Sequence, residues 1–275
     1  MRASRQFVLA SATAATLAAF PALAAAPLIS HRAVYDLALD NASDRSGITG
    51  LHGRMVYEFN GSPCEGYTVN FRFVTRIDTS ENSRLTDQQT TTFEDGGGKS
   101  FSFVTKSFTD QALDRELKGT ATREADGLKV EIDKPEKNSL ELGKTQFPTQ
   151  HLVELIGKAN TGERFYETNL FDGSENGDKV MTTTVVVGKK TEAAADDPEL
   201  PVLKTLGKDQ YWPVDIAYFD DDDDGGEEVP EYRIAFKLHE NGLTRDLTMD
   251  YGDFSMTGKL VNLSVFDTPP QQTCK

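Results

Sequence analysis

Alternating apolar and polar positions dominate the chain and predict β-strands. Apolar side chains recur at every second position from Tyr67 through Phe71 and Phe73 to Ile77, with mostly polar residues between them. A strand of this kind has one face on a core and one face in water. The same alternation recurs in residues 101–103, 128–132, 214–218, 232–238 and 247–251. Residues 180–187 are nearly all β-branched, which predicts a strand covered on both faces.

Turn-forming dipeptides separate these segments. Asn-Gly and Asp-Gly supply the positive φ that tight hairpin turns require. The chain has five such pairs, namely Asn60-Gly61, Asp126-Gly127, Asp172-Gly173, Asn176-Gly177 and Asn241-Gly242. We therefore expect a mainly β protein, with a dozen or more antiparallel strands in one meandering sheet.

One segment, residues 149–157, departs from the alternation. Leu152, Leu155 and Ile156 stand at helical spacing, Thr149 can cap the start, and Gly157 lies near the end. The sequence predicts a single short helix here, which plugs one opening of the curled sheet.

Residues 1–26 have the features of a secretory signal peptide. Arg2 and Arg5 form a positive start, an uncharged run of about 14 residues follows, and small residues permit cleavage after Ala24 or Ala26. That run is too short to span a bilayer, and no later stretch is longer. A buried N-terminal helix is the rival interpretation. We expect residues 27–275 to form one exported domain that does not span the membrane.

The charge of the chain excludes one class of partner. The formal charge is −15, and removal of Arg2 and Arg5 gives −15 − 2 = −17. Such a negative charge repels nucleic acid and anionic lipid and favours solubility. We expect no nucleic-acid partner.

The chain has two cysteines, Cys64 and Cys274. An even pair in an oxidising compartment predicts a disulfide, which would tie the C-terminal tail to an early strand. Two free thiols are the alternative. No Cys-x-x-Cys sequence supports redox catalysis.

The chain contains one weak candidate calcium loop. The carboxylates that match its ligand spacing are Asp220, Asp222, Asp224 and Glu231. Five consecutive aspartates satisfy any alternate-aspartate pattern, however, and the flanking segments alternate as strands where such a loop has helices. We therefore expect residues 189–198 and 220–228 to be exposed loops, with a weak calcium site at the second as the alternative.

Catalysis has no local signature. The sequence lacks a Gly-x-Ser-x-Gly elbow and a His-Glu-x-x-His helix, and none of the histidines His31, His52, His151 and His239 stands at metal-ligand spacing with another. We expect His31 and His151 to pack or to form local hydrogen bonds. Gly96–Ser100 lacks a required phosphate-loop glycine, so it predicts a turn between strands. No enzyme activity and no cofactor are expected.

Several short segments together resemble the alphaproteobacterial cell envelope integrity protein B family, formerly a domain of unknown function. The matching segments are residues 30–39, 147–151, 170–174, 212–214 and 250–254, and both cysteines match as well. The motif residues within them are His31, Arg32, Tyr35, Asp36, His151 and Trp212. They occur in the family's order and cover nearly all of the chain after the leader.

The resemblance implies a periplasmic protein with a long, strongly bent antiparallel sheet. This sheet forms an open β-spiral or half-barrel with one short helix and a disulfide between Cys64 and Cys274. The resemblance also implies a non-enzymatic role in envelope integrity, in concert with a periplasmic tetratricopeptide-repeat protein. The spiral is similar in shape to lipoprotein carriers, and no catalytic residues transfer from the family.

The preferred hypothesis is a binding scaffold whose concave, aromatic-lined face holds a lipid, a lipoprotein segment or a partner protein. A wide spiral leaves an apolar cleft that a closed barrel fills with side chains. Two alternatives stay open. The first is an envelope hydrolase whose site assembles from distant residues, and the second is a structural protein that responds to calcium through the acidic loop.

Overall fold

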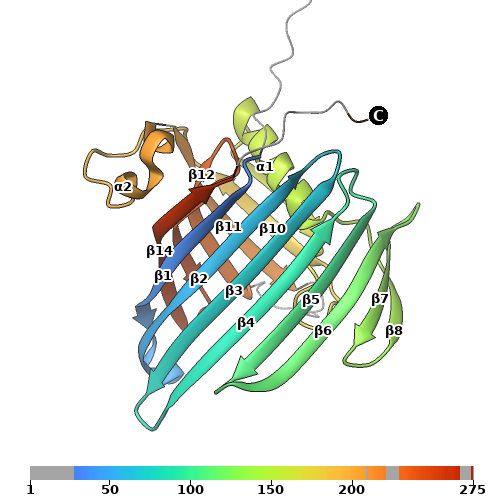
Figure 1. Ribbon diagram of the computed structural model, residues 1–275, viewed down its shortest axis with the longest axis horizontal. Coiled ribbons are helices and arrows are strands. Elements are labelled where there is room, and N and C mark those ends of the chain that lie inside the picture. Colours follow the sequence, from blue (N-terminus) through green and yellow to red (C-terminus); the bar gives the residue numbers. More distant parts are fainter. Residues whose placement is uncertain (1–27, 209, 221–228, 267–273, 275) are drawn as a thin grey trace, which may run out of the picture.

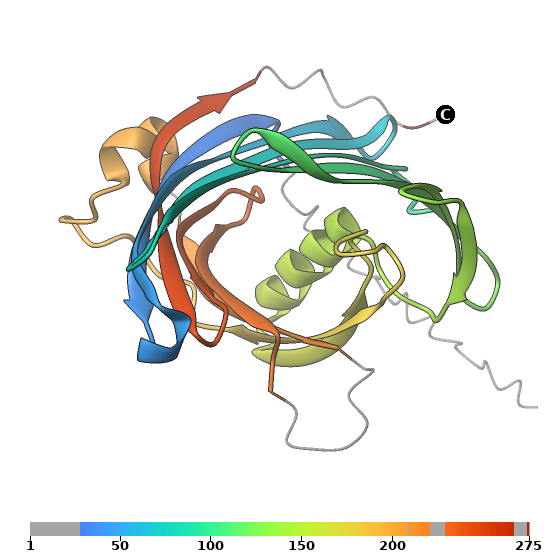
Figure 2. The same ribbon diagram turned by 90° about the horizontal axis from the view of Figure 1, so that it is seen from below.

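The structure, a computed structural model, describes residues 28–208, 210–220, 229–266 and 274. Within these residues fourteen strands form one antiparallel sheet that curls strongly without closing (Figures 1 and 2). The predicted fold class, a mainly β protein with one strongly bent sheet, is confirmed. The predicted leader, residues 1–26, lies outside the described residues.

Strands β1 to β8 pair in chain order, and so do strands β9 to β14, with α1 between the two series. Their bounds are β1 His31–Ala42, β2 Ile48–Ser62, β3 Gly66–Thr79, β4 Ser83–Glu94, β5 Ser100–Thr109, β6 Ala112–Arg123, β7 Leu128–Lys134, β8 Asn138–Leu142, β9 Phe165–Leu170, β10 Met181–Val187, β11 Tyr211–Asp220, β12 Tyr232–His239, β13 Thr244–Asp250 and β14 Phe254–Val265. The helices are α1 Pro148–Thr161 and α2 Leu200–Leu203, and the short 3₁₀ turns are η1 Asp44–Ser46 and η2 Lys204–Lys208.

The two ends of the strand series meet in the middle of the sheet. The spatial order is β8-β7-β6-β5-β4-β3-β2-β1-β14-β13-β12-β11-β10-β9, so β1 pairs with β14. The edge strands β8 and β9 are neighbours in sequence, and α1 joins them. Gln146, just before α1, forms a parallel bridge to Leu170 of β9. The curl thus brings the edge strand β9 close to the segment that follows the opposite edge strand, β8.

Each strand turns one face toward the inside of the curl, which we call the inner face. On β1 the inner side chains His31, Ala33, Tyr35 and Leu37 are buried, whereas Arg32 and Asp36 on the outer face are exposed. Three apolar clusters form the core. One cluster lies on β1, β2, β13 and β14, the second on α1 with β9–β12, and the third on β5–β7 with Phe147 and Phe171.

Helix α1 lies inside the curl of the sheet (Figure 2). Its residues Leu155, Ile156 and Ala159 pack on the cluster of β9–β12. The helix is longer than the sequence predicts, because Gly157 is an interior residue and the left-handed Gly162 follows the last turn. Thr149 is not its cap. Thr149 is the second residue of the helix, and a carboxylate from β4 takes over the capping role.

Three local predictions are wrong for identifiable reasons. Asn60-Gly61 belongs to β2, and the turn follows it at residues 63–65. Asp172-Gly173 and Asn176-Gly177 share one long connection between β9 and β10. Strand β10 is buried on one face only, since Val186 on the other face is 49% exposed. The outer face of β10 is therefore not covered at Val186, although the strand is paired on both sides.

Cys64, in the turn between β2 and β3, forms a disulfide with Cys274 in the structure. The bond joins residues that are 210 positions apart. Among the described residues, neither helix has the length and apolar character that crossing a membrane requires.

Candidate binding face

The inner face of β2 and β3 carries aromatic side chains that the core does not fully cover. Tyr57 is paired with Phe71, and Met55 is paired with Phe73 on the neighbouring strand. Tyr57, Phe71 and Phe73 are half-buried and pack against the cluster of β1, β2, β13 and β14. Residues that face the inside of a filled barrel are normally fully buried. These rings therefore leave apolar surface within reach of a ligand.

A second aromatic series crosses β11–β14. Its rings stack in sequence, with centroid distances of 4.2 Å for Tyr218–Tyr232, 6.2 Å for Tyr232–Tyr251 and 5.1 Å for Tyr251–Phe254. Burial raises the pKa of Tyr232 well above its ordinary value, and the neighbouring Tyr218 adds to the effect. The phenols therefore stay protonated and uncharged at neutral pH.

Hydroxyl groups occupy the inner face of β4 and β5. The Oγ1 atoms of Thr75 and Thr86 lie 2.7 Å apart, and those of Thr90 and Thr105 lie 3.0 Å apart. These pairs join β3 to β4 and β4 to β5 on the side that the aromatic residues of β3 share. The inner face thus combines apolar rings with uncharged hydrogen-bonding groups, an arrangement that suits an uncharged, partly apolar ligand.

A buried carboxylate fixes the start of α1 against the sheet. Glu94 of β4 is 2% exposed, and its two oxygens accept the backbone N–H groups of Thr149 and Gln150 at 2.7 and 3.0 Å. The first N–H groups of a helix have no partner within the helix, so this carboxylate satisfies two of them. Burial raises the pKa of Glu94, although these two hydrogen bonds oppose that effect.

Arg123 of β6 completes this anchor. Its guanidinium donates to the carbonyl oxygens of Gly98 and Thr145 and to Oε1 of Gln150, each at 2.9 Å. The same group lies over the ring of Phe147, 5.1 Å from its centroid. The glycine turn before β5, the approach to α1 and the helix itself are therefore tied together at one point.

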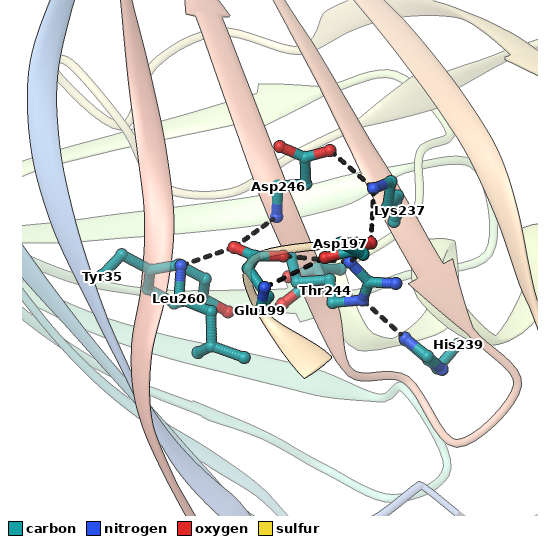
Figure 3. Close-up of polar contacts among 9 residues, drawn as sticks. Tyr35, Asp197, Glu199, Lys237, His239, Thr244, Asp246 and Leu260 are labelled. Carbon is teal, nitrogen blue, oxygen red and sulfur yellow. Dashed lines mark hydrogen bonds and ion pairs between the residues drawn. The ribbon is translucent and has the colours of Figure 1, made fainter. Parts of the chain in front are cut away.

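A second polar cluster, the Arg245 network, consists of Arg245 and the groups bonded around it, namely Asp197, Glu199, Lys237 and His239. Figure 3 labels these four residues around Arg245. The Arg245 side chain is 0% exposed and pairs with Asp197 at 2.8 Å and with Glu199 at 3.1 Å. Its Nε donates to Nε2 of His239 at 3.1 Å. Lys237 binds Asp197 at 2.9 Å. Phe236 and Leu238 of β12 pack in the cluster of α1, so Lys237 between them points to the opposite face. Arg245 pairs with Lys237 and lies on that face too.

The network shifts the pKa values of two members in the same direction. Burial lowers the pKa of His239 to about 4, and the nearby Arg245 cation adds to this effect. Burial alone would raise the pKa of Asp197, but Lys237, the Glu199 amide and Arg245 outweigh it and lower the pKa to about 2. In the folded protein at neutral pH, His239 is therefore neutral and Asp197 is ionised.

The structure does not bring the family-motif residues together at one site. Arg32 and Asp36 form outer-face ion pairs with Glu58 and Arg54, respectively. Tyr35 donates its hydroxyl to the carbonyl oxygen of Thr244 at 2.6 Å. These contacts hold β1 in the centre of the sheet.

The remaining motif residues surround α1 and its neighbours. Nδ1 of His31 lies 2.9 Å from the carbonyl oxygen of Ile29, and the ring borders a small pocket with Leu152 of α1. His151 is buried, and its Nε2 has no hydrogen-bond partner in the structure. Trp212 lies beneath the ammonium group of Lys190, 4.3 Å from the ring centroid. These residues are packing and positioning groups around α1.

The acidic loop falls largely outside the described residues, which include neither Asp222 nor Asp224. Asp220 forms an ion pair with Lys179. Burial raises the pKa of Glu231, and the nearby acids Glu175 and Asp220 add to the effect. The expectation that residues 189–198 form an exposed loop is wrong at one position, because the Arg245 network buries Asp197.

Sequence reasoning missed Glu94, Arg123 and the Arg245 network. Glu94 and Arg123 bind partners that are 22 to 56 residues away along the chain. The two carboxylates that bind Arg245 are 46 and 48 residues away from it. One local signal was present. Arg245 occupies the same alternate position as the apolar Leu247 and Met249, so it places a charge where the pattern favours an apolar residue.

Comparison with known proteins places this arrangement in one family. A sequence model described as EipB-like matches residues 22–267. The cell envelope integrity protein EipB of Brucella abortus (strain 2308) is 58% identical over 255 residues, which are 92% of this chain and 89% of that protein. The crystal structure of a beta-barrel-like protein of a domain of unknown function from Brucella abortus is similar, with a TM-score of 0.86 and 58% identity. The match covers 88% of this chain and 100% of that one.

Proposed function

Because this chain belongs to the EipB-like family, we propose that it supports the integrity of the cell envelope as a binding protein and not as an enzyme. The names of both relatives contain no enzymatic term. The observation that carries the proposal is the inner face, where Tyr57, Phe71 and Phe73 stay half-buried inside the curl of the sheet. Apolar surface that core packing leaves partly exposed is available for contact with a ligand.

The ligand class follows from the chemistry of this face. Half-buried rings and threonine hydroxyls favour an uncharged or amphipathic molecule, so we propose a lipid or a lipoprotein segment. The resemblance to the family adds a periplasmic tetratricopeptide-repeat protein as the functional partner. Both proposals require export, which the segment of residues 1–26 supports through its signal-peptide pattern. The proposed location is the periplasm.

A matched pair of variants tests the binding face. Phe73 lies on the inner face, whereas Phe93 lies on the outer face of β4 and is 42% exposed. The mature protein, Phe73→Ser and Phe93→Ser would each be purified from the native envelope, and the co-purifying lipids and proteins identified by mass spectrometry. We expect Phe73→Ser to lose the bound species and Phe93→Ser to keep it. Equal recovery from both variants would contradict binding at the inner face.

The cellular role has its own test. Deletion of the gene should sensitise cells to detergents and to antibiotics that act on the cell wall. The wild-type gene and the Phe93→Ser gene should restore resistance, whereas Phe73→Ser should not. Unchanged sensitivity of the deletion strain would contradict the envelope role.

A further inference from the structure

The hydrogen-bond ladder between β13 and β14 covers only part of either strand. Four residue pairs join them, from Leu247–Gly258 to Asp250–Ser255. Beyond Gly258, β14 continues to Val265 beside β1. The hairpin between β12 and β13 turns instead toward α1, where Glu240 accepts a hydrogen bond from Asn160 at 3.3 Å. The two strands therefore separate at one end of the sheet.

A carboxylate fills the break in the ladder. Oε1 of Glu199 accepts the backbone N–H groups of Leu260 on β14 at 2.6 Å and of Asp246 on β13 at 3.3 Å (Figure 3). These two amides belong to the two strands that separate. Glu199 thus satisfies donors that the interrupted ladder leaves without a strand partner, and an unsatisfied buried donor is costly.

Glu199 belongs to a segment that covers this break, residues 189–203, which we call the strap. The strap leaves the sheet after β10 and includes α2, which lies outside the sheet beside β14 (Figures 1 and 2). Leu203 of the strap is 2% exposed and packs in the same cluster as Tyr35, Leu247 and Leu260. That cluster also holds the half-buried rings of the inner face. The strap therefore separates solvent from the apolar interior at this position.

Ionisable groups attach the strap to the sheet. Within the part of the chain that the structure describes, the charged or titratable groups that act on His239 or stack on its ring come from four elements. Tyr211 lies on β11, Lys237 on β12, Arg245 on β13 and Asp197 on the strap. Asp246 of β13 extends the set through its ion pair with Lys237 at 2.9 Å. In this arrangement Nε2 of His239 accepts the Nε–H of Arg245, so the imidazole must be neutral there.

We propose that the strap is a releasable cover over the break between β13 and β14, and that protonation of His239 releases it. A protonated imidazole has no acceptor for Arg245, and it adds a third cation beside Arg245 and Lys237. The network is poorly able to replace the bond that protonation breaks. Nη2 of Arg245 and Nδ1 of His239 already have no hydrogen-bond partner in the structure. Release would open a side route to the inner face. A role for this route in ligand entry rests on the proposed binding function, whereas the release of the strap does not.

Hydrogen exchange of the ligand-free mature protein tests the release. Peptides from residues 197–203 and 243–261 would be followed at pH 7.5 and pH 5, with rates corrected for the intrinsic effect of pH. We expect exchange in these peptides to accelerate tenfold or more at pH 5, because protonation favours the open state. Peptides from β2 and β3 should keep their protection. Equal acceleration throughout the chain would mean global unfolding and would overturn the proposal.

Two variants assign the effect to His239. His239→Gln keeps a neutral side chain at both pH values, so its strap peptides should exchange slowly at pH 5 as well. The control is His52→Gln, which replaces an exposed histidine on β2 and should behave as the wild type does. Acceleration that persists in His239→Gln, or protection that is equal at both pH values in the wild type, would overturn the proposal. Because no ligand is present, neither result depends on the binding function.

Discussion

Helix α1 and the strap both connect parts of the sheet, and at each a buried carboxylate accepts backbone amides, yet different forces hold them. Glu94 accepts the first amides of α1, and Leu155, Ile156 and Ala159 of this helix pack in an apolar cluster. Glu199 receives two strand amides within a network of charges. Apolar packing depends little on pH, whereas an ion network depends on the protonation of every member. We therefore expect the α1 connection to be insensitive to pH and the strap to be conditional on it.

Removal of the disulfide should have the largest effect on the free energy of unfolding. It also tests whether the acid sensitivity of the strap is independent of overall stability. Cys64→Ser should lower the free energy of unfolding by as much as about 5 kcal/mol, because a bond across a loop of this length mainly restricts the unfolded chain. Urea unfolding of the mature protein measures the loss, and reductant should reproduce it in the wild type. Since the bond acts on the unfolded state, the acid sensitivity of the strap should not change. Two alkylatable thiols in the oxidised protein would contradict the disulfide.

Removal of Arg245 is the most direct attack on the network. Arg245→Met leaves Asp197 and Glu199 buried without their guanidinium partner, and such a change typically costs about 3–5 kcal/mol. Chemical unfolding at pH 7.5 measures the change. The matched control is Arg32→Met, which breaks an exposed ion pair with Glu58 and should cost less than about 1 kcal/mol. An equal loss of unfolding free energy in the two variants would show that the buried network stabilises the protein no more than an exposed ion pair does.

The sequence predicts the strands and α1, because these elements depend on local periodicity. Alternation locates the strands because side-chain direction in a strand repeats every two residues, and the spacing of Leu152, Leu155 and Ile156 locates α1. The anchors cannot be located in this way. Glu94 has the appearance of an ordinary strand residue until the fold brings Thr149 to it, and Glu199 meets Leu260 only because β13 and β14 separate.

The wrong turn at Asn60-Gly61 has a similar origin. Its dipeptide favours a tight hairpin, and Gly61 does adopt a positive φ of 133°. In the folded chain, however, Gly61 pairs with Tyr67 and Ser62 pairs with Gly66, so the ladder continues past the dipeptide. The turn is made instead around Cys64, which bonds to the distant Cys274. A tertiary bond and a continuous ladder thus outweigh a local turn preference.

Titration of His239 should give the next largest effect. Its pKa is about 4 in the folded protein, against the ordinary 6.5 expected after unfolding. A lowered pKa means that the unfolded chain binds the proton more tightly. The stability due to neutral His239 is thus complete above pH 6.5 and is lost as the pH falls toward 4. The loss is roughly 3 kcal/mol.

Urea unfolding from pH 7.5 down to about pH 2 measures this dependence in the wild type and in His239→Gln. The variant should show a shallower decline between pH 6.5 and pH 4. A further decline should remain in both proteins below about pH 4, where protonation of Asp197 begins to favour the unfolded chain. Parallel curves for the two proteins would mean that His239 does not make the strap conditional.

The smallest effect is expected at the α1 anchor, where Glu94→Gln should change stability by less than about 1 kcal/mol. Burial raises the pKa of Glu94, so the folded protein already disfavours its charge, and acidification through this group favours the folded state. Glutamine removes that charge, which offsets the loss of an acceptor for one of the two helix amides. Glu94→Leu is the control, because it leaves the amides of Thr149 and Gln150 without an acceptor and should cost about 1–3 kcal/mol. Urea unfolding at pH 7.5 compares the two. If Glu94→Gln were as costly as Glu94→Leu, the charge itself would hold α1, and the helix would be no less conditional than the strap.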